Sequence, residues 1–331
     1  MQHFPVTNSN LSAEHLSLFL QEKYALSKDT KCRLIRAGIN DTYLVSNASE
    51  KFIFRVYSLG WRTETEIAEE LRLLSKLHEN NISVSYPIPD NANNYIQELN
   101  APEGDRFAVL FTYANGEKLH NIPAETHFQI GKLMGRFHKL TDNQTLKRVH
   151  YTPEIILVDS LKKMENFLHP ETAEMQFMKS TQKYLLHEFS KINSSAIRYG
   201  IVHLDIWFDN LNVTDTNEIT IFDFDFCGNG WLCLDIAYYI LQLHNIEKYE
   251  AKDYMPKIES FLNGYKSVNE INASERALIP MLGLSLYYFY LGIQCERFEN
   301  YSNVFLNENY LKRFINGLVK RYYEIIKQDE E

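Results

Sequence analysis

Cysteine is scarce in this sequence, and the spacing of the few that occur argues against two common architectures. Four cysteines among 331 residues fit neither the closely paired ligands of a structural zinc site nor the dense bridges of a small secreted domain. They are Cys32, Cys227, Cys233 and Cys295. We therefore expect reduced thiols and a cytoplasmic protein.

A basic surface, a leader and a membrane span are also lacking. The formal net charge of -9 argues against a nucleic-acid partner, which would show as a basic stripe. Residues 1–10 contain no basic stretch followed by an apolar run, so we expect no secretory signal. The longest apolar run, residues 277–293, includes Pro280 and Gly283 and is short for a bilayer span. It is better explained as a buried helix, so we expect no membrane partner.

Apolar residues are plentiful, and the chain is long enough for two packed lobes, because single cores rarely grow beyond about 250 residues. In residues 1–114, alternating patterns predict five strands, with one helix inserted among them and another before them. From residue 115 to 331 the pattern changes to long helical periods, interrupted by short β-like runs. The sequence thus predicts an α+β fold, with a small N-terminal lobe built on an antiparallel sheet and a larger, mainly helical C-terminal lobe.

Two short apolar runs in the second part each deliver acidic or amide side chains. Asp205 follows the first run, Asn210 lies shortly after it, and Asp223 ends the second run. Phosphoryl transfer needs a carboxylate that accepts the proton of the attacking hydroxyl, and oxygen ligands that hold magnesium against the phosphates. Each residue alone could finish a turn or cap a helix. Together they fit the requirements of phosphoryl transfer.

These residues also resemble a known family. The run from His203 through Asp205 to Asn210, followed by Asp223 and then by Asp235, is similar to the motifs of the aminoglycoside phosphotransferase and choline kinase family. The resemblance implies a bilobal, protein-kinase-like fold that uses ATP and Mg2+. It implies Asp205 as the catalytic base and Asn210 and Asp223 as magnesium ligands. His203 and Asp235 would be supports that fix the catalytic loop.

The first lobe offers candidates for nucleotide binding. The turn that contains Gly38, Asn40 and Thr42 could lay backbone N–H groups and a hydroxyl against phosphates, although it could equally be an ordinary hairpin turn. By the same resemblance, Arg55 would touch the nucleotide phosphates and pair with Glu70, with Glu69 as an alternative partner. Many members of that family have lysine at the position of Arg55, and arginine is a larger, forked donor.

The strand near residue 110 resembles the family's hinge, where backbone groups bind the adenine edge. Phe111, Thr112 and Tyr113 would line that slot. A plain edge strand remains the alternative.

The acceptor is predicted to be a small molecule. The segment between Asp223 and Asp235 is short and has no Ala-Pro-Glu-type anchor for docking a peptide. A polar, amine-bearing acceptor could be bound by carboxylates and aromatic rings, although tyrosines at helical spacing are also common in cores and Asp225 could be a surface carboxylate. The candidates are Trp207, Asp209, Asp225, Trp231, Tyr287, Tyr288 and Tyr290.

The predicted function is therefore ATP- and Mg2+-dependent transfer of a γ-phosphate to a hydroxyl of an amino alcohol, an aminoglycoside or a homoserine-like molecule. Two alternatives remain open, a compact serine/threonine protein kinase and a nucleotide-binding pseudokinase that serves as an interaction module.

Overall fold

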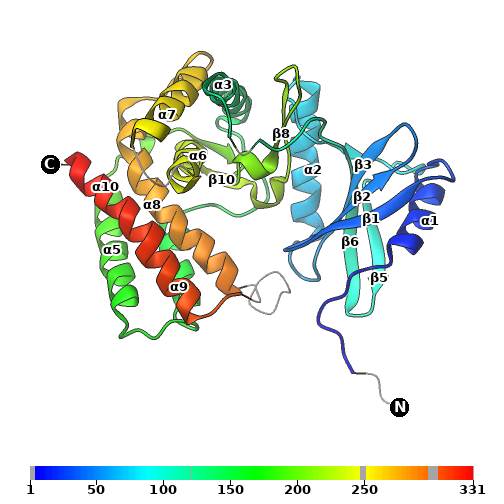
Figure 1. Cartoon of the computed structure of the whole chain (residues 1–331), viewed down its shortest axis with the longest axis horizontal. Coiled ribbons are helices and arrows are strands. Elements are labelled where there is room, and N and C mark those ends of the chain that lie inside the picture. Colours follow the sequence, from blue (N-terminus) through cyan, green and yellow to red (C-terminus); the bar gives the residue numbers. More distant parts are fainter. Residues whose placement is uncertain (1–3, 120, 247–250, 297–304, 331) are drawn as a thin grey trace. The chain divides into compact units, whose positions relative to one another are not determined.

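The computed structural model describes residues 4–119, 121–246, 251–296 and 305–330 (Figure 1). Residues 1–3 of the segment considered for a leader therefore lie outside the described residues. The chain divides into two compact units. The first contains the chain up to Asn115 together with Thr220–Phe222, and the second contains most of the described chain from Gly116 onward.

The first unit is built on an antiparallel sheet in the order β1-β2-β3-β6-β4, with β5 also paired to β6. Its strands are β1 (Lys31–Ala37), β2 (Asp41–Ser46), β3 (Lys51–Val56), β4 (Pro87–Ile88), β5 (Ile96–Ala101) and β6 (Gly104–Thr112). Five of these strands were predicted. The sixth, β4, contains a proline and is too short to produce a recognisable alternation.

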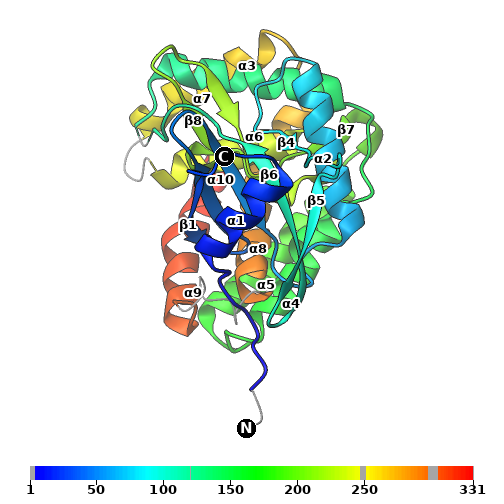
Figure 2. The ribbon, with the colours of Figure 1, turned by 90° about the vertical axis from the view of Figure 1, so that its right-hand side faces the viewer.

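Two helices accompany this sheet. α1 (Ala13–Lys23) packs Leu16 and Leu20 against alternate residues of β2, β3 and β6, and Figure 2 shows it lying across the strands. α2 (Glu64–Glu79) begins with a capping box, in which Thr63 and Glu66 bind each other's backbone N–H groups. Because strand residues alternate between faces, the face opposite α1 carries the side chains that matter for the site below.

The second unit is mainly helical, as the long periods predicted. Its helices are α3 (Ala124–Thr141), η1 (Glu154–Asp159), α4 (Ser160–Met164), α5 (Ala173–Ser190), η2 (Ser194–Ala196), α6 (Cys233–Ile246), α7 (Ala251–Lys266), α8 (Ala273–Glu296), α9 (Glu308–Phe314), η6 (Ile315–Val319) and α10 (Lys320–Glu330). The short elements that deliver the polar groups are β7 (Tyr199–Val202), η3 (Phe208–Asn210), β8 (Leu211–Val213), η4 (Phe224–Phe226) and β10 (Gly228–Trp231). β9 (Ile219–Ile221), which precedes Asp223, belongs to the first unit from Thr220 onward.

Close packing of α3 against α7 depends on glycine. A Cβ atom at Gly264 would lie 1.9 Å from the carbonyl oxygen of Phe128, and one at Gly131 would lie 2.0 Å from that of Phe261. These distances are far inside van der Waals contact, so only glycine lets the two backbones approach this closely.

The long apolar run forms α8. By length and composition this helix could cross a membrane, but 72% of its most apolar window is buried inside the protein. It packs against α4 and α6, as a core helix does. The prediction of a buried helix therefore agrees with the structure.

Candidate active site

The loop that follows β7 is held by a buried carboxylate. Asp235, in the first turn of α6, accepts the backbone N–H of His203 at 2.9 Å and that of Leu204 at 2.6 Å. His138 Nε2 lies 3.0 Å from the same side chain. Leu204 has a φ of 65°, a left-handed conformation that a leucine adopts only when its surroundings enforce it. Asp235 is therefore placed to hold this loop in an unfavourable backbone conformation.

The next residues position Asp205. The Nδ1 atom of His203 accepts the backbone N–H of Asp205 at 3.1 Å. Asn210 donates its side-chain N–H groups to the Asp205 carboxylate at 2.7 Å and to the Asp205 carbonyl at 3.0 Å. On the other carboxylate oxygen, Tyr238 and Tyr290 donate their hydroxyls at 2.6 and 2.8 Å. The loop and two helices thus fix Asp205 from both sides.

The pKa of Asp205 is raised to about 7. Burial is the main cause and the nearby charge of Asp223 adds to it, while the hydrogen bonds from Tyr238, Tyr290 and Asn210 act in the opposite direction. A carboxyl group with a pKa near neutrality can exchange a proton at physiological pH. Strong perturbation of this kind is typical of functional sites, although ion-pair networks also produce it.

Two side chains near Asp205 carry oxygen atoms of the kind that could bind magnesium. Because Asn210 uses its amide nitrogen on Asp205, its Oδ1 atom is the part of the side chain left to bind a metal. Asp223 precedes η4 with φ 64° and ψ 64°, and its charge raises the pKa values of both Asp205 and Tyr290, so the two carboxylates lie within electrostatic range.

Across the described parts of the chain, no group of three or more His, Cys, Asp or Glu side chains could hold a metal. Magnesium is commonly bound by one or two protein ligands and completed by water and phosphate oxygens. The amide of Asn210 and the carboxylate of Asp223 meet that requirement.

In the first unit, Arg55 forms a buried ion pair. Its Nη1 atom lies 3.1 Å from Oε1 of Glu70, and both side chains are largely shielded from solvent. The hydroxyl of Tyr57 donates to the same glutamate at 3.3 Å. Glu69, the alternative partner in the sequence, instead pairs with Arg72 at 2.8 Å. The structure therefore selects Glu70 as the partner of Arg55.

The turn between β1 and β2 is held by side-chain contacts. The N–H of Gly38 donates to the carbonyl of Asn40 at 3.3 Å, and Oδ1 of Asn40 accepts the backbone N–H of Ser58 at 3.2 Å. Thr42 lies directly opposite Arg55 in the β2–β3 ladder, so their side chains share one face of the sheet. Asn40 thus holds the turn, whereas Thr42 shares the face of Arg55.

Part of the predicted hinge forms hydrogen bonds within the first unit. The N–H of Thr112 donates to the carbonyl of Tyr86 at 2.9 Å, and its carbonyl accepts the hydroxyl of Ser85 at 2.5 Å. Phe111 is buried in the sheet opposite Ile53. The backbone groups of Thr112 are therefore occupied, and adenine contacts in this segment would fall to Tyr113.

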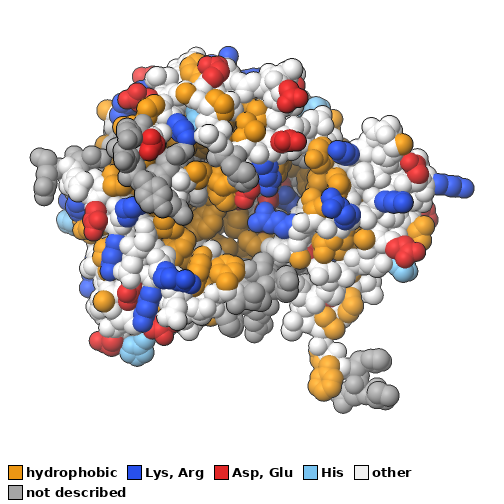
Figure 3. All heavy atoms as spheres, viewed as in Figure 1, with side chains coloured by type: hydrophobic (Ala, Val, Ile, Leu, Met, Phe, Trp, Pro, Cys, Tyr) orange, Lys and Arg blue, Asp and Glu red, His pale blue; other side chains and the backbone are white. Residues whose placement is uncertain are grey.

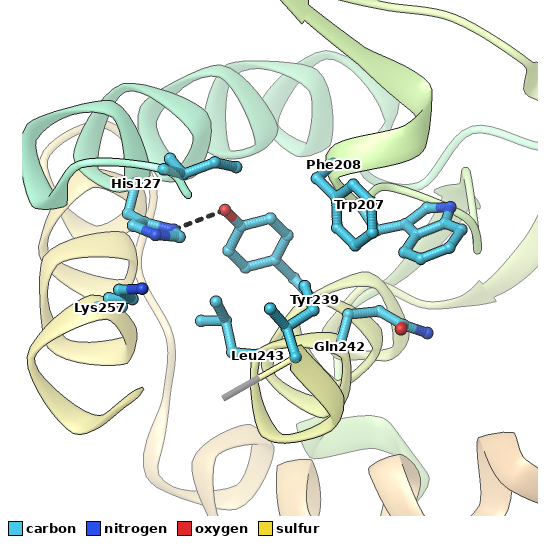
Figure 4. A pocket seen from close by; sticks show the side chains of 9 residues that line it. His127, Trp207, Phe208, Tyr239, Gln242, Leu243 and Lys257 are labelled. Carbon is cyan, nitrogen blue, oxygen red and sulfur yellow. Dashed lines mark hydrogen bonds between the residues drawn. The ribbon is translucent and has the colours of Figure 1, made fainter. Parts of the chain in front are cut away.

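A small cavity of about 20 Å³ adjoins the loop after Asp205, and Figure 4 shows its wall. Burial and the charge of Lys257 lower the pKa of His127 to about 4, against an opposing influence of the Ile122 backbone, so this imidazole is neutral. Its Nδ1 atom lies 2.7 Å from the hydroxyl of Tyr239. The cavity has room for about one water molecule. Its lining is Ile122, His127, Trp207, Phe208, Tyr239, Gln242, Leu243, Ile246 and Lys257.

The candidates for acceptor binding lie in different places. Trp207 lines the cavity just described, and Asp209 forms an ion pair with Lys118 at 3.3 Å. Asp225 is buried, so the interpretation as a surface carboxylate is wrong. Trp231 pairs with Tyr199, at the end of the β7–β10 ladder farthest from the Asp205 loop. Of these four residues, Trp231 is the one that the strand register places away from the Asp205 loop.

The tyrosines of α8 also differ in their hydrogen-bond partners. The hydroxyls of Tyr287 and Tyr288 bind Asn245 at 2.6 Å and the Met178 carbonyl at 2.8 Å, whereas that of Tyr290 binds Asp205. Tyr238 was not predicted from the sequence. Its position three residues after Asp235 on a helix places it on the same face, and that spacing is the signal that could have revealed it.

The chain is similar to several proteins of known kind. The model of the Phosphotransferase enzyme family matches residues 31–266. The amicoumacin kinase of Bacillus subtilis (strain 168) is 25% identical over 268 residues, which cover 78% of this chain and 77% of that protein. The homoserine kinase of Methylobacillus glycogenes is 23% identical over 260 residues, with the same two coverages of 78% and 77%.

Solved structures share the fold. The microcompartment-associated aminopropanol kinase gives a TM-score of 0.77 at 20% identity, covering 96% of this chain and 98% of that chain. An amicoumacin kinase in complex with AMP-PNP, Ca2+ and Ami gives 0.76 at 20% identity, covering 95% and 97%. The predicted α+β, kinase-like fold is thereby confirmed.

Proposed function

The chain belongs to the phosphotransferase enzyme family, as its motifs predicted, and from this premise we propose that it transfers the γ-phosphate of ATP to a hydroxyl group of a small molecule in a Mg2+-dependent reaction. The observation that carries the proposal is the buried Asp205 carboxylate, held by Asn210 and close to the charge of Asp223. This arrangement matches the base and oxygen ligands that phosphoryl transfer requires.

In the proposed reaction, Asp205 orients the acceptor hydroxyl and takes its proton. The acceptor oxygen forms a bond to the γ-phosphorus, and the bond from that phosphorus to the bridging oxygen breaks, so that ADP leaves. Asn210 keeps the carboxylate in place through its 2.7 Å hydrogen bond. Asn210 and Asp223 would hold the magnesium ion, which supplies positive charge to the phosphate oxygens when bound.

Residues of the first unit would bind the nucleotide. Arg55, held by Glu70, presents a forked donor that suits phosphate oxygens, and Thr42 on the same face adds a hydroxyl. The backbone of Gly38 would face phosphate, and Tyr113 would contact adenine. The similar structure that contains AMP-PNP and Ca2+ supports a nucleotide with a divalent ion, and a site with few protein ligands beside phosphate oxygens suits Mg2+ in this chain.

A small acceptor fits better than a protein. The segment between Asp223 and Asp235 forms η4 and then β10, which is paired along its length with β7. None of this segment resembles a long activation segment on which a peptide could dock. Aminopropanol and homoserine, which name two of the similar kinases, both carry an amine and a hydroxyl, so an amino alcohol is our first choice of acceptor.

The cytoplasm is the compartment we propose. All four cysteines are free, and Cys227, Cys233 and Cys295 are buried. Free thiols persist in reducing compartments, where glutathione and thioredoxin prevent disulfide formation.

Two substitutions test the assignment of the site. Asp205→Asn should abolish transfer while ATP binding stays close to that of the wild type, because a base acts on the acceptor. Asp223→Asn should instead weaken Mg2+-dependent nucleotide binding. Calorimetric titration with ATP, with and without Mg2+, together with a transfer assay separates the two effects. Wild-type transfer rates in both variants would contradict the assignment.

A further inference from the structure

Two tyrosine hydroxyls contact the same carboxylate oxygen of the proposed base. The hydroxyls of Tyr238 and Tyr290 both bind Oδ1 of Asp205, at 2.6 and 2.8 Å, and they also contact each other. The two rings stack with centroids 5.6 Å apart and an interplanar angle of 11°. Tyr238 comes from α6 and Tyr290 from α8, which pack together in the second unit. The contact is therefore built by the core of this unit.

The two phenols differ in exposure. Tyr238 is completely buried, at 0% exposure, whereas Tyr290 is only partly buried. Tyr290 is thus the less enclosed member of the pair. The other carboxylate oxygen, Oδ2, is covered by the amide of Asn210. Each oxygen of the base already accepts a hydrogen bond within the chain.

A general base must come within hydrogen-bonding reach of the proton it removes. Oδ1 already accepts two hydrogen bonds, so an acceptor hydroxyl that binds this oxygen has to take a place that a hydroxyl of the protein occupies. Asn210 cannot give up its place without loosening the loop, and Tyr238 is enclosed by the core. Tyr290 is an O–H donor 2.8 Å from the carboxylate, which is the geometry that an acceptor hydroxyl would need.

We propose that Tyr290 is a specificity-determining residue, whose phenol occupies the place of the acceptor hydroxyl on Asp205 until an alcohol-bearing acceptor displaces it. The inference rests on the proposed function and concerns the same site. It explains how the base would be protected from water: the phenol fills the position from which a water molecule would otherwise attack the γ-phosphate. A ligand larger than water, with further contacts in the helical unit, can displace the ring.

The test measures hydrolysis of Mg2+-ATP with no acceptor present, so water is the only nucleophile. Tyr290→Phe keeps the ring and removes the hydroxyl. We expect the rate of hydrolysis to rise about tenfold, which is the factor that corresponds to the free energy of one hydrogen bond to a charged group. The rise should disappear in the double variant Asp205→Asn with Tyr290→Phe, because water then has no base. Tyr288→Phe is the matched control: it removes a phenol from the same helix whose hydrogen bond goes to Met178, so hydrolysis should stay at the wild-type rate.

Damage to the fold would lower hydrolysis, so a rise cannot come from a merely structural role of Tyr290. Tyr290→Leu, which also removes the hydroxyl, serves as a second variant if the phenylalanine variant is unstable. Hydrolysis at or below the wild-type rate in folded variants that bind ATP normally would overturn the inference and leave the proposed function intact. A wild-type protein that does not bind Mg2+-ATP, measured on the same samples, would overturn the proposed function and the inference with it.

Discussion

The support of the catalytic loop by Asp235 leads to a quantitative prediction for Asp235→Asn. The carboxylate accepts hydrogen bonds on both oxygens, from the backbone of His203 and Leu204 and from His138. An asparagine of the same shape has one accepting oxygen and one donating amide nitrogen. Whichever way the amide turns, at least one buried backbone N–H faces another donor.

The size of the effect follows from these contacts. Losing one hydrogen bond to a charged group costs about 1.5–3 kcal/mol, and the unsatisfied buried N–H adds to it, so the free energy of unfolding should fall by about 3 kcal/mol. The left-handed Leu204 is then less well held and Asp205 shifts. Because a displacement of about 1 Å can reduce a rate by about 100-fold, kcat should fall by that order.

Urea unfolding followed by tryptophan fluorescence is a suitable assay, since Trp207 and Trp231 both lie in the second unit. Asp159→Asn is the control, because Asp159 is a largely exposed carboxylate that pairs with Lys162 one turn away, and the loss of that pair should change stability by less than about 0.5 kcal/mol. An Asp235→Asn protein as stable as this control, with an unchanged kcat, would refute the reasoning.

Three further predictions follow from the same contacts. The kcat/KM for transfer should rise with pH and level off above about 7, because Asp205 must lose its proton to act as a base, and a flat rate profile would contradict this. Because the pKa of Asp205 is higher in the folded than in the unfolded chain, its protonation should stabilise the fold at low pH, and this contribution should be lost as pH rises through about 7; a free energy of unfolding that does not fall over that range would contradict this second expectation. Arg55→Ala should raise the KM for ATP and destabilise the first unit by about 3 kcal/mol, because the buried carboxylate of Glu70 loses the positive charge of Arg55. Arg55→Lys should have smaller effects on both, and equal unfolding curves for wild type and Arg55→Ala would count against this account. Gly264→Ala should lower the free energy of unfolding by about 3 kcal/mol, because the added methyl group would clash with α3. Gly317→Ala is the control: a methyl group there would meet nothing within 4 Å, so the change should be neutral or slightly stabilising. Similar melting temperatures for the two variants would refute this prediction.

Much of the site could be predicted because its parts are close in sequence. Asp205 and Asn210 belong to one loop, so their spacing already places an amide beside a carboxylate. Arg55 and Glu70 come from a strand and the next helix, and the resemblance to a known family supplied their order. Asp235 needed that resemblance too, since nothing in its local sequence shows that it turns back to the backbone of His203.

Other features could not be predicted because they depend on long-range packing. Tyr290 was one of several tyrosines on an apolar helix, and only the packing of α8 against α6 distinguishes it from Tyr288. Trp231 was selected for its residue type, but its register against β7 places it at the far end of that ladder. The strands β4 and β10 are too short for periodicity to reveal. The π-helical segments η1 and η6 lie within longer helical patterns, so the sequence periodicity does not distinguish them from α-helix.

The most direct test of the central claim is to incubate the protein with ATP, Mg2+ and a mixture of amino alcohols, aminoglycosides and homoserine, with a generic protein substrate in a parallel sample, and to identify phosphorylated products by mass spectrometry. We predict one phosphorylated small molecule, absent when Asp205→Asn replaces the wild type. ATP binding without any phosphorylated small molecule, or phosphate found only on the protein substrate, would contradict the account.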